Sequence, residues 1–200
     1  VKPPISGGAD GTFRLERDDM VPASVAGQRM MIQPYVPNIA EEGEYSLFYF
    51  GGNFSHAIIK RPAAGDLRVQ EQYGGYEAAV TPPAAAQDLA QRAFAATASI
   101  TGAGTLAYAR VDLLRDGDGV FRLMELELIE PSLFLRFAPD NGTAFAEALL
   151  ATAGTKRSPA SGGLFLCLTV IGDDLAAGLQ FRFMASLAPA FGQGILLPRK

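Results

Sequence analysis

The chain has 200 residues, and its 17 lysines and arginines against 21 aspartates and glutamates give a formal net charge of −4. This acidic balance argues against a broad nucleic-acid surface, and 48% hydrophobic residues argue against a disordered chain. The single cysteine, Cys167, excludes an internal disulfide, and no Cys/His cluster has the spacing of a zinc site. No apolar run reaches the ~20 residues of a membrane span, and the first residues lack a signal-peptide pattern, so we expect a cytoplasmic protein.

The first forty residues read as loops and short strands. Val1-Lys2-Pro3 has the pattern of a strand entering a loop, from which we expect an N-terminally truncated piece of a longer protein. A glycine-rich loop over residues 5–12 is predicted to lead into a returning strand at residues 13–15. Residues 30–33 predict a further strand, which the prolines after it bring to an end.

The middle of the chain predicts a hairpin and a single strand. Residues 45–50 and 54–60 are rich in β-forming side chains, and Gly51-Gly52-Asn53 between them is typical of a tight turn. Residues 67–69 predict a short strand. Gly74-Gly75 then interrupts the pattern.

A helix is predicted to begin after Pro82-Pro83 and to end at residues 102–104. Its apolar face, at helical spacing, consists of Leu89, Ala90, Ala93, Phe94, Thr97 and Ile100. Strands follow at residues 106–114 and 121–129, with a turn between them. A last helix, capped from Asn141-Gly142-Thr143, is predicted to run through Ala151.

The composition changes after Gly154. Residues 1–154 form one predicted α+β domain, whereas residues 155–163 read as a linker rich in serine, glycine and proline. Residues 164–198 are very apolar and have no clear period, so residues 155–200 are left without an assigned structure or role.

Three carboxylates on the second predicted hairpin are the first candidate site. Side chains alternate along a strand, so Glu125 and Glu127 share a face, and the turn brings Asp112 near them. Carboxylates in an apolar setting need a neutralising partner, and an all-oxygen ligand set suits Mg²⁺ held together with nucleotide phosphates. On spacing alone, a solvated face of an edge hairpin is an equal alternative, although the apolar flanking residues disfavour it.

Two cationic segments are the second candidate. Lys2 with the glycine-rich loop resembles a phosphate cradle, but the loop lacks the Walker A ending, and a plain flexible hairpin is favoured on pattern alone. Lys60-Arg61 and Arg68 flank a turn from which cations could hold a phosphoryl group, the alternative being an ordinary basic surface turn. His56 follows Ser55 on a strand, where neighbours face opposite ways, so a structural histidine is the favoured interpretation.

Six motifs follow one another in a distinctive order, and the last two are the specific ones. They are Lys2-Pro3 with the glycine-rich loop, Met31–Pro37, Gly43–Leu47, Lys60–Gln70 with Gly74-Gly75, Ala109–Leu114, and Met124–Ser132. This order resembles the ATP-grasp superfamily of ligases over residues 1 to about 151. It is most similar to the bacterial glutathione synthetase branch and to the cycloserine-forming ligase.

The resemblance implies an ATP-grasp fold, in which two α+β subdomains grip ATP. It implies that Asp112, Glu125 and Glu127 bind Mg²⁺, with Mn²⁺ as the alternative ion, and that Arg68 steadies the γ-phosphate. Glu130, Pro131 and Ser132 are expected where the family's loop approaches substrate. The residues expected to bind ATP are Lys2, Gly7, Gly8, Gly11, Thr12, Gln33, Tyr35, Val36 and Glu44.

Three departures from the family pattern matter. Glu127 stands where the glutathione synthetase pattern has an asparagine, and Ser46 stands near the position of an arginine, for which Lys60 is the expected substitute. The family's N-terminal domain, with an earlier nucleotide-binding lysine, is also absent from this sequence.

The implied activity is an ADP-forming carbon–nitrogen ligase that joins a small-molecule carboxylate to an amine through an acyl phosphate. A nucleotide-binding fragment without turnover, and a ligase adding glutamate to a protein or peptide, are the alternatives. Neither a nucleic-acid nor a membrane partner is expected. The two substrates and the question of a homo-oligomer stay open.

Overall fold

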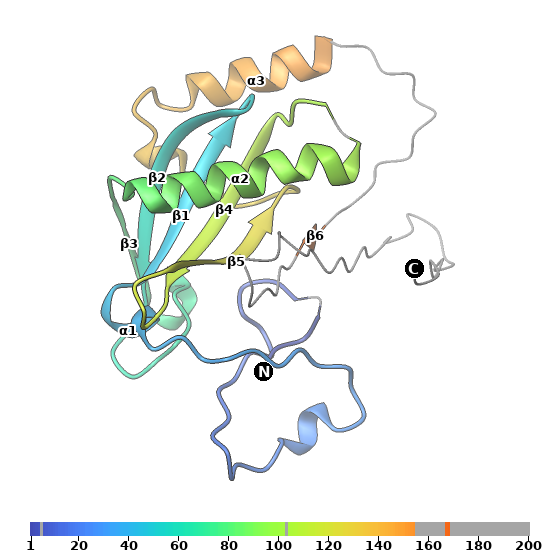
Figure 1. Ribbon diagram of the computed structural model, residues 1–200, viewed down its shortest axis with the longest axis vertical. Helices are drawn as coiled ribbons and strands as arrows, with labels where there is room; N and C mark the ends of the chain where they lie inside the picture. Colours follow the sequence, from blue (N-terminus) through green and yellow to red (C-terminus); the bar gives the residue numbers. More distant parts are fainter. Residues whose placement is uncertain (5, 103, 155–166, 169–200) are drawn as a thin grey trace.

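The computed structural model describes residues 1–4, 6–102, 104–154 and 167–168, and it has an antiparallel sheet in the order β3-β2-β1-β4-β5-β6 (Figure 1). The strands are β1 (Glu44–Phe50), β2 (Asn53–Arg61), β3 (Tyr76–Ala79), β4 (Tyr108–Arg115), β5 (Phe121–Glu127) and β6 (Cys167–Leu168). The helices are α1 (Asn38–Glu41), α2 (Ala84–Thr101) and α3 (Thr143–Gly154), with single 3-10 turns η1 (Ala23–Val25), η2 (Glu71–Tyr73) and η3 (Leu135–Phe137). None of these helices is long and apolar enough to cross a membrane.

Each face of the sheet has its own apolar cluster. Helix α2 lies across one face (Figure 1), where Leu89 and Ala93 pack against Leu47 and Val111. The helix begins after Pro83 and ends at Gly102 in a left-handed conformation, as predicted. Of its predicted apolar face, Ile100 at the last turn is 37% exposed.

The opposite face divides along the strands into an apolar end and a polar end. At the apolar end, Phe48, Phe50 and Ile58 pack against α3 and the loop before it. The side chain of Asp140 caps the first turn of α3, since its Oδ2 accepts the N–H of Ala144 at 2.8 Å. The predicted cap at Asn141-Gly142-Thr143 is therefore wrong by one residue. The uncovered polar end carries the candidate site.

Both predicted hairpins are confirmed, but three predicted short strands are wrong. Residues 13–15 and 30–33 form no strand; backbone hydrogen bonds join Val1 to Phe13, and an isolated bridge joins Lys2 to Met31. Residues 67–69 also form none, and the third strand of this region is β3 instead. Apart from Cys167–Leu168, the apolar segment after residue 154 lies outside the described residues.

Candidate active site

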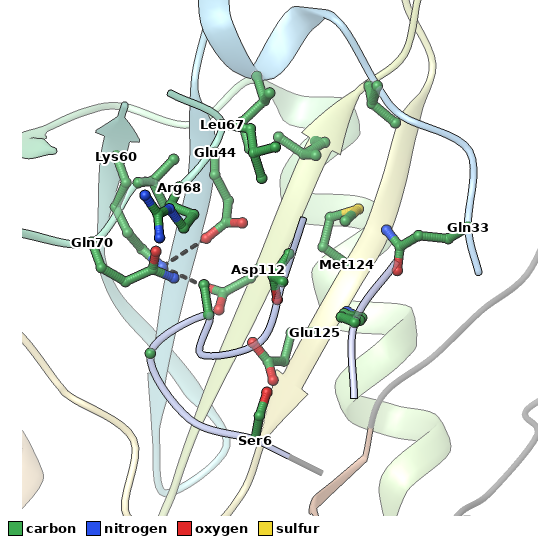
Figure 2. Close-up of a pocket in the computed structure, with 18 of the residues that line it drawn as sticks. Ser6, Gln33, Glu44, Lys60, Leu67, Arg68, Gln70, Asp112, Met124 and Glu125 are labelled. Atoms are coloured by element: carbon green, nitrogen blue, oxygen red, sulfur yellow. Dashed lines mark hydrogen bonds and ion pairs between the residues drawn. The ribbon is translucent and has the colours of Figure 1, made fainter. Parts of the chain in front are cut away.

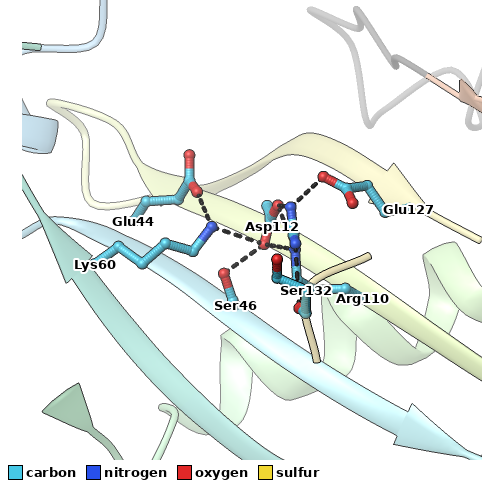
Figure 3. A network of polar contacts seen from close by, with 7 residues as sticks. All are labelled: Glu44, Ser46, Lys60, Arg110, Asp112, Glu127 and Ser132. Atoms are coloured by element: carbon cyan, nitrogen blue, oxygen red, sulfur yellow. Dashed lines mark hydrogen bonds and ion pairs between the residues drawn. The ribbon is translucent and has the colours of Figure 1, made fainter. Parts of the chain in front are cut away.

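The polar end of the sheet carries seven side chains that approach one another, mainly charged and largely withdrawn from solvent. Figure 3 shows all of them except Glu125, which is labelled in Figure 2. Alternation along β1, β2, β4 and β5 places them all on the face that α2 leaves open. We call them the charged cluster, which consists of Glu44, Ser46, Lys60, Arg110, Asp112, Glu125 and Glu127.

Asp112 is the centre of the charged cluster and is 1% exposed. One of its oxygens accepts the Ser46 hydroxyl at 2.5 Å, and both accept the Nε of Arg110, at 3.1 and 3.0 Å. Burial alone would raise the pKa of Asp112, but the charges of Arg110 and Lys60 outweigh burial and hold that pKa below its usual range. Asp112 is therefore ionised at neutral pH.

Lys60 joins Asp112 to Glu44. Its Nζ donates to Glu44 Oε1 at 2.7 Å and lies 3.5 Å from Asp112 Oδ1. Burial works to lower the pKa of Lys60, but the two carboxylates raise it above its usual value, so the ammonium group stays charged. Gly43 allows the backbones to approach closely where Glu44 pairs with Lys60. Its φ is +102°, and a Cβ built there would lie 2.4 Å from the Lys60 carbonyl oxygen.

The three predicted metal ligands do come together. Asp112, Glu125 and Glu127 each offer a carboxylate oxygen, and these oxygens lie within 4.8 Å of one another. The carboxylate of Glu125 makes no hydrogen bond or ion pair within the part of the chain that the structure describes. Burial raises its pKa to about 7, and the neighbouring carboxylates of Asp112, Glu127 and Glu44 act in the same direction, with Arg110 opposing.

A divalent cation fits this arrangement. Three oxygen donors without nitrogen or sulfur are a ligand set that suits Mg²⁺. Burial raises the pKa of Glu127 as well. The positive charges of Lys60 and Arg110 therefore do not fully compensate the burial of these carboxylates. An ion between the three carboxylates would supply the charge that favours their ionised forms.

Arg110 was not predicted as a site residue. It is 7% exposed and contacts Asp112 and Glu127 through its guanidinium group, while its Nη1 donates to the Ser132 carbonyl at 3.3 Å (Figure 3). The signal was present in the sequence, since a residue two positions before Asp112 on a strand must share its face.

A cavity of about 1140 Å³ lies in front of the charged cluster (Figure 2). Its lining includes every predicted site residue except Gly11. Of the predicted substrate loop, Glu130 and Ser132 line the cavity and Pro131 does not. The structure thus gathers the predicted nucleotide, metal and phosphate residues around one space, while their individual roles stay predictions.

Arg68 lies at one side of the cavity, near Lys60 and Gln70 (Figure 2). Its Nη2 is 2.8 Å from Asp66 Oδ2, and its guanidinium carbon lies 3.6 Å from the ring centroid of Tyr73. The ion pair and the stacking hold the guanidinium in place beside the predicted phosphate region. Gln70, another lining residue that was not predicted, has a buried Oε1 without a hydrogen-bond partner among the described residues.

The glycine-rich loop reaches the same side of the cavity. The Gly8 carbonyl accepts a hydrogen bond from Gln72 Nε2 at 3.3 Å, and Gly8 has a φ of +61°. The segment with Gln33, Tyr35 and Val36 forms the far wall, where the Arg14 guanidinium carbon lies 4.2 Å from the Tyr35 ring centroid. The loop and this wall both border the space predicted for the nucleotide.

The loop after β5 is held by contacts from two strands. Besides Arg110, His56 of β2 contacts it, with Nε2 lying 3.1 Å from the Leu133 carbonyl oxygen. The His56 ring also stacks on Phe48, and burial lowers the pKa of His56. These contacts agree with the structural interpretation of His56. Phe134 in this loop has a φ of +45°, a conformation that costs energy for a bulky residue.

The comparisons with known proteins show a similarity to a cycloserine biosynthesis protein. No family model matches the chain. The cycloserine biosynthesis protein DcsG of Streptomyces lavendulae is 37% identical over 129 residues, which are 62% of this chain and 42% of DcsG. The crystal structure of D-cycloserine synthetase DcsG aligns with a TM-score of 0.54 at 35% identity, over 60% of this chain and 41% of that one. The chain is a homologue of DcsG. Its antiparallel sheet with the packed helices matches the aligned part of DcsG, in agreement with the ATP-grasp fold that the motifs imply.

Two further structures are more distant. A D-alanine–D-alanine ligase from Bacillus anthracis, complexed with ATP, aligns with a TM-score of 0.39 at 21% identity, over 56% of this chain and 38% of that one. A RiPP-associated ATP-grasp ligase from Chryseobacterium gregarium gives a TM-score of 0.41 at 10% identity, over 58% and 34%. Neither likeness is strong enough to support an argument. The predicted similarity to the cycloserine-forming ligase is confirmed, while that to glutathione synthetase stays a prediction.

Proposed function

We propose that the chain is the ATP-binding part of a Mg²⁺-dependent, ADP-forming carboxylate–amine ligase. The observation that carries the proposal is the convergence of three carboxylates, with oxygens within 4.8 Å, beside two buried cations on the wall of the cavity. Homology to a protein called a D-cycloserine synthetase supports ligation as the reaction class. The chain spans about 42% of the length of DcsG, so the proposal concerns the whole protein to which this part contributes.

Asp112, Glu125 and Glu127 would hold the magnesium ion. A bound magnesium ion would neutralise charge on the phosphates of ATP during transfer. The chain itself supplies Lys60, Arg110 and Arg68 as further positive charge on the same side of the cavity. Because phosphoryl transfer relies on positioning and charge stabilisation, no protein nucleophile is required.

The reaction would proceed in two displacements. The substrate carboxylate oxygen attacks the γ-phosphorus, the bond to the β-phosphate oxygen breaks, and ADP leaves as the acyl phosphate forms. The amine nitrogen then attacks the acyl carbon, the carbon–oxygen bond to phosphate breaks, and the nitrogen loses a proton as the amide forms. In both steps negative charge develops on phosphate oxygens, which is where the cations of the charged cluster would act.

The other predicted nucleotide-binding residues would bind the rest of ATP. Lys2 and the loop containing Gly7, Gly8, Gly11 and Thr12 would cover the triphosphate through backbone N–H groups and one positive charge. The far wall, formed by Gln33, Tyr35 and Val36, would meet the adenine. Glu44, which the resemblance puts near the ribose, also anchors Lys60 and so links the two regions.

A steady-state assay of phosphate release tests the proposal. With the full-length protein, ATP and Mg²⁺, a ligase releases phosphate only when a carboxylic acid and an amine are both present, and a panel of small amino acids is the first set of probes. Release with a protein or peptide acceptor alone would favour the glutamate-adding alternative. ATP binding without release under any condition would favour a nucleotide-binding role, and that outcome would refute ligation.

A further inference from the structure

Arg110 already neutralises two of the three carboxylates that are proposed to hold the metal ion. Its Nε lies 3.0 Å and its Nη2 2.9 Å from Asp112 Oδ2, and Nη2 also contacts Glu127. Contacts of this kind between ions are stronger than those between neutral groups. Of the three carboxylates, Glu125 alone has no hydrogen-bond or ion-pair partner in the described chain.

A guanidinium and a divalent cation cannot share these carboxylates without a large repulsion. Arg110 and Asp112 are only 7% and 1% exposed, so water screens the charges of these two side chains poorly. Lys60 is differently placed. Its close contact, at 2.7 Å, is with Glu44, and it stays 3.5 Å from Asp112. The competition with an incoming ion therefore falls on Arg110.

We propose that Arg110 is a displaceable internal counter-ion: metal binding takes Glu127 and Asp112 from its guanidinium group, which then turns toward the cavity. A path for this movement exists, because Nη1 already donates to the Ser132 carbonyl on the cavity wall at 3.3 Å. The inference rests on the metal site of the proposed function. It adds that loading the metal also frees a guanidinium to face the negatively charged reactants.

In this chain, Glu127 is one of the two carboxylates that hold the Arg110 guanidinium. The strands β4 and β5 pair so that Arg110 lies opposite Glu127. The Nη2 of Arg110 therefore contacts both Asp112 on its own strand and Glu127 on β5. A neutral amide at position 127, as in the glutathione synthetase pattern, would hold a guanidinium less strongly than a carboxylate does.

Metal affinity without nucleotide provides the first test, with Mn²⁺ as the probe and electron paramagnetic resonance as the measurement. Arg110→Met removes the competing group, so we expect it to bind Mn²⁺ at least tenfold more tightly than the unmodified protein. Arg122→Met is the matched control, since Arg122 lies on β5, pairs with Asp116 and does not line the cavity. The control loses the same charge and should bind Mn²⁺ as the unmodified protein does.

Nuclear magnetic resonance of the arginine Nε–H groups in the unmodified protein separates displacement from a general charge effect. On titration with Mg²⁺, the Arg110 signal should move or broaden while the Arg122 signal stays. Mg²⁺ binding that leaves the Arg110 signal unchanged would overturn the inference, as would a folded Arg110→Met that binds Mn²⁺ no more tightly. If neither the unmodified protein nor any variant bound Mn²⁺, the proposed metal site itself would be wrong.

Discussion

Replacing Glu125 with glutamine should stabilise the metal-free protein at neutral and alkaline pH. Burial beside other carboxylates raises the pKa of Glu125 from 4.5 to about 7. The folded state therefore binds a proton that the unfolded state releases, and stability falls as the pH rises between these two values. Glutamine has a similar shape and stays neutral at every pH in this range, so the variant does not undergo this decrease in stability.

The size of the effect follows from the two pKa values. The folded pKa lies about 2.5 above the unfolded one, and this corresponds to roughly 3 kcal/mol of unfolding free energy above pH 7. Below pH 4.5 both states carry the proton, so the difference between the two proteins should disappear there. Relaxation of the site around a charged Glu125 makes the value an upper bound.

Urea unfolding followed by circular dichroism, in the presence of a chelator and at several pH values between about 4.5 and 8, measures this difference. Comparing the two proteins at each pH cancels the other titrating groups. Glu147→Gln is the matched control, because Glu147 is exposed on α3, and its stability should follow that of the unmodified protein. Equal stability of Glu125→Gln and the unmodified protein at every pH would refute the reasoning.

Three further substitutions test other parts of the structure by the same urea assay. Lys60→Met should cost about 3–5 kcal/mol, because it leaves buried carboxylates without their partner, and a loss under about 1 kcal/mol would contradict the arrangement. His56→Leu should cost about 1–3 kcal/mol, because it removes the donor to the Leu133 carbonyl. Since the pKa of His56 is lowered in the folded state, the unmodified protein should become less stable below about pH 6.5, and the variant should not show this decrease. Asp140→Ala should cost about 1 kcal/mol by removing the cap of α3, whereas Asn141→Gly should have little effect.

The two hairpins and α2 could be predicted because local signals agree with the tertiary structure there. Gly51-Gly52 forms the turn between two strands of β-forming residues, and the apolar face of α2 has a helical period that matches its packing on the sheet. The same alternation places Asp112, Glu125 and Glu127 on one face, so the candidate metal site also follows from the sequence.

The errors fall where a short apolar run had no partner that the sequence could reveal. Val69 is 3% exposed, but it is buried in a turn that Gly75 closes, since a Cβ at Gly75 would lie 2.1 Å from the Val69 carbonyl oxygen. The strand of this region forms instead at β3, where Tyr76 and Glu77 pair with β2. Arg110 is a different case. Strand alternation already places it on the face of Asp112, but its contact with Glu127 depends on the register between β4 and β5.

The measurement that tests the central proposal most directly is calorimetric titration of ATP into the chain, with and without Mg²⁺. The account predicts saturable binding that depends on Mg²⁺ and that Glu125→Gln greatly weakens, because the ion links the three carboxylates to the phosphates. ATP binding of equal strength with and without Mg²⁺, and unchanged by Glu125→Gln, would contradict the assignment of Asp112, Glu125 and Glu127 as the metal site.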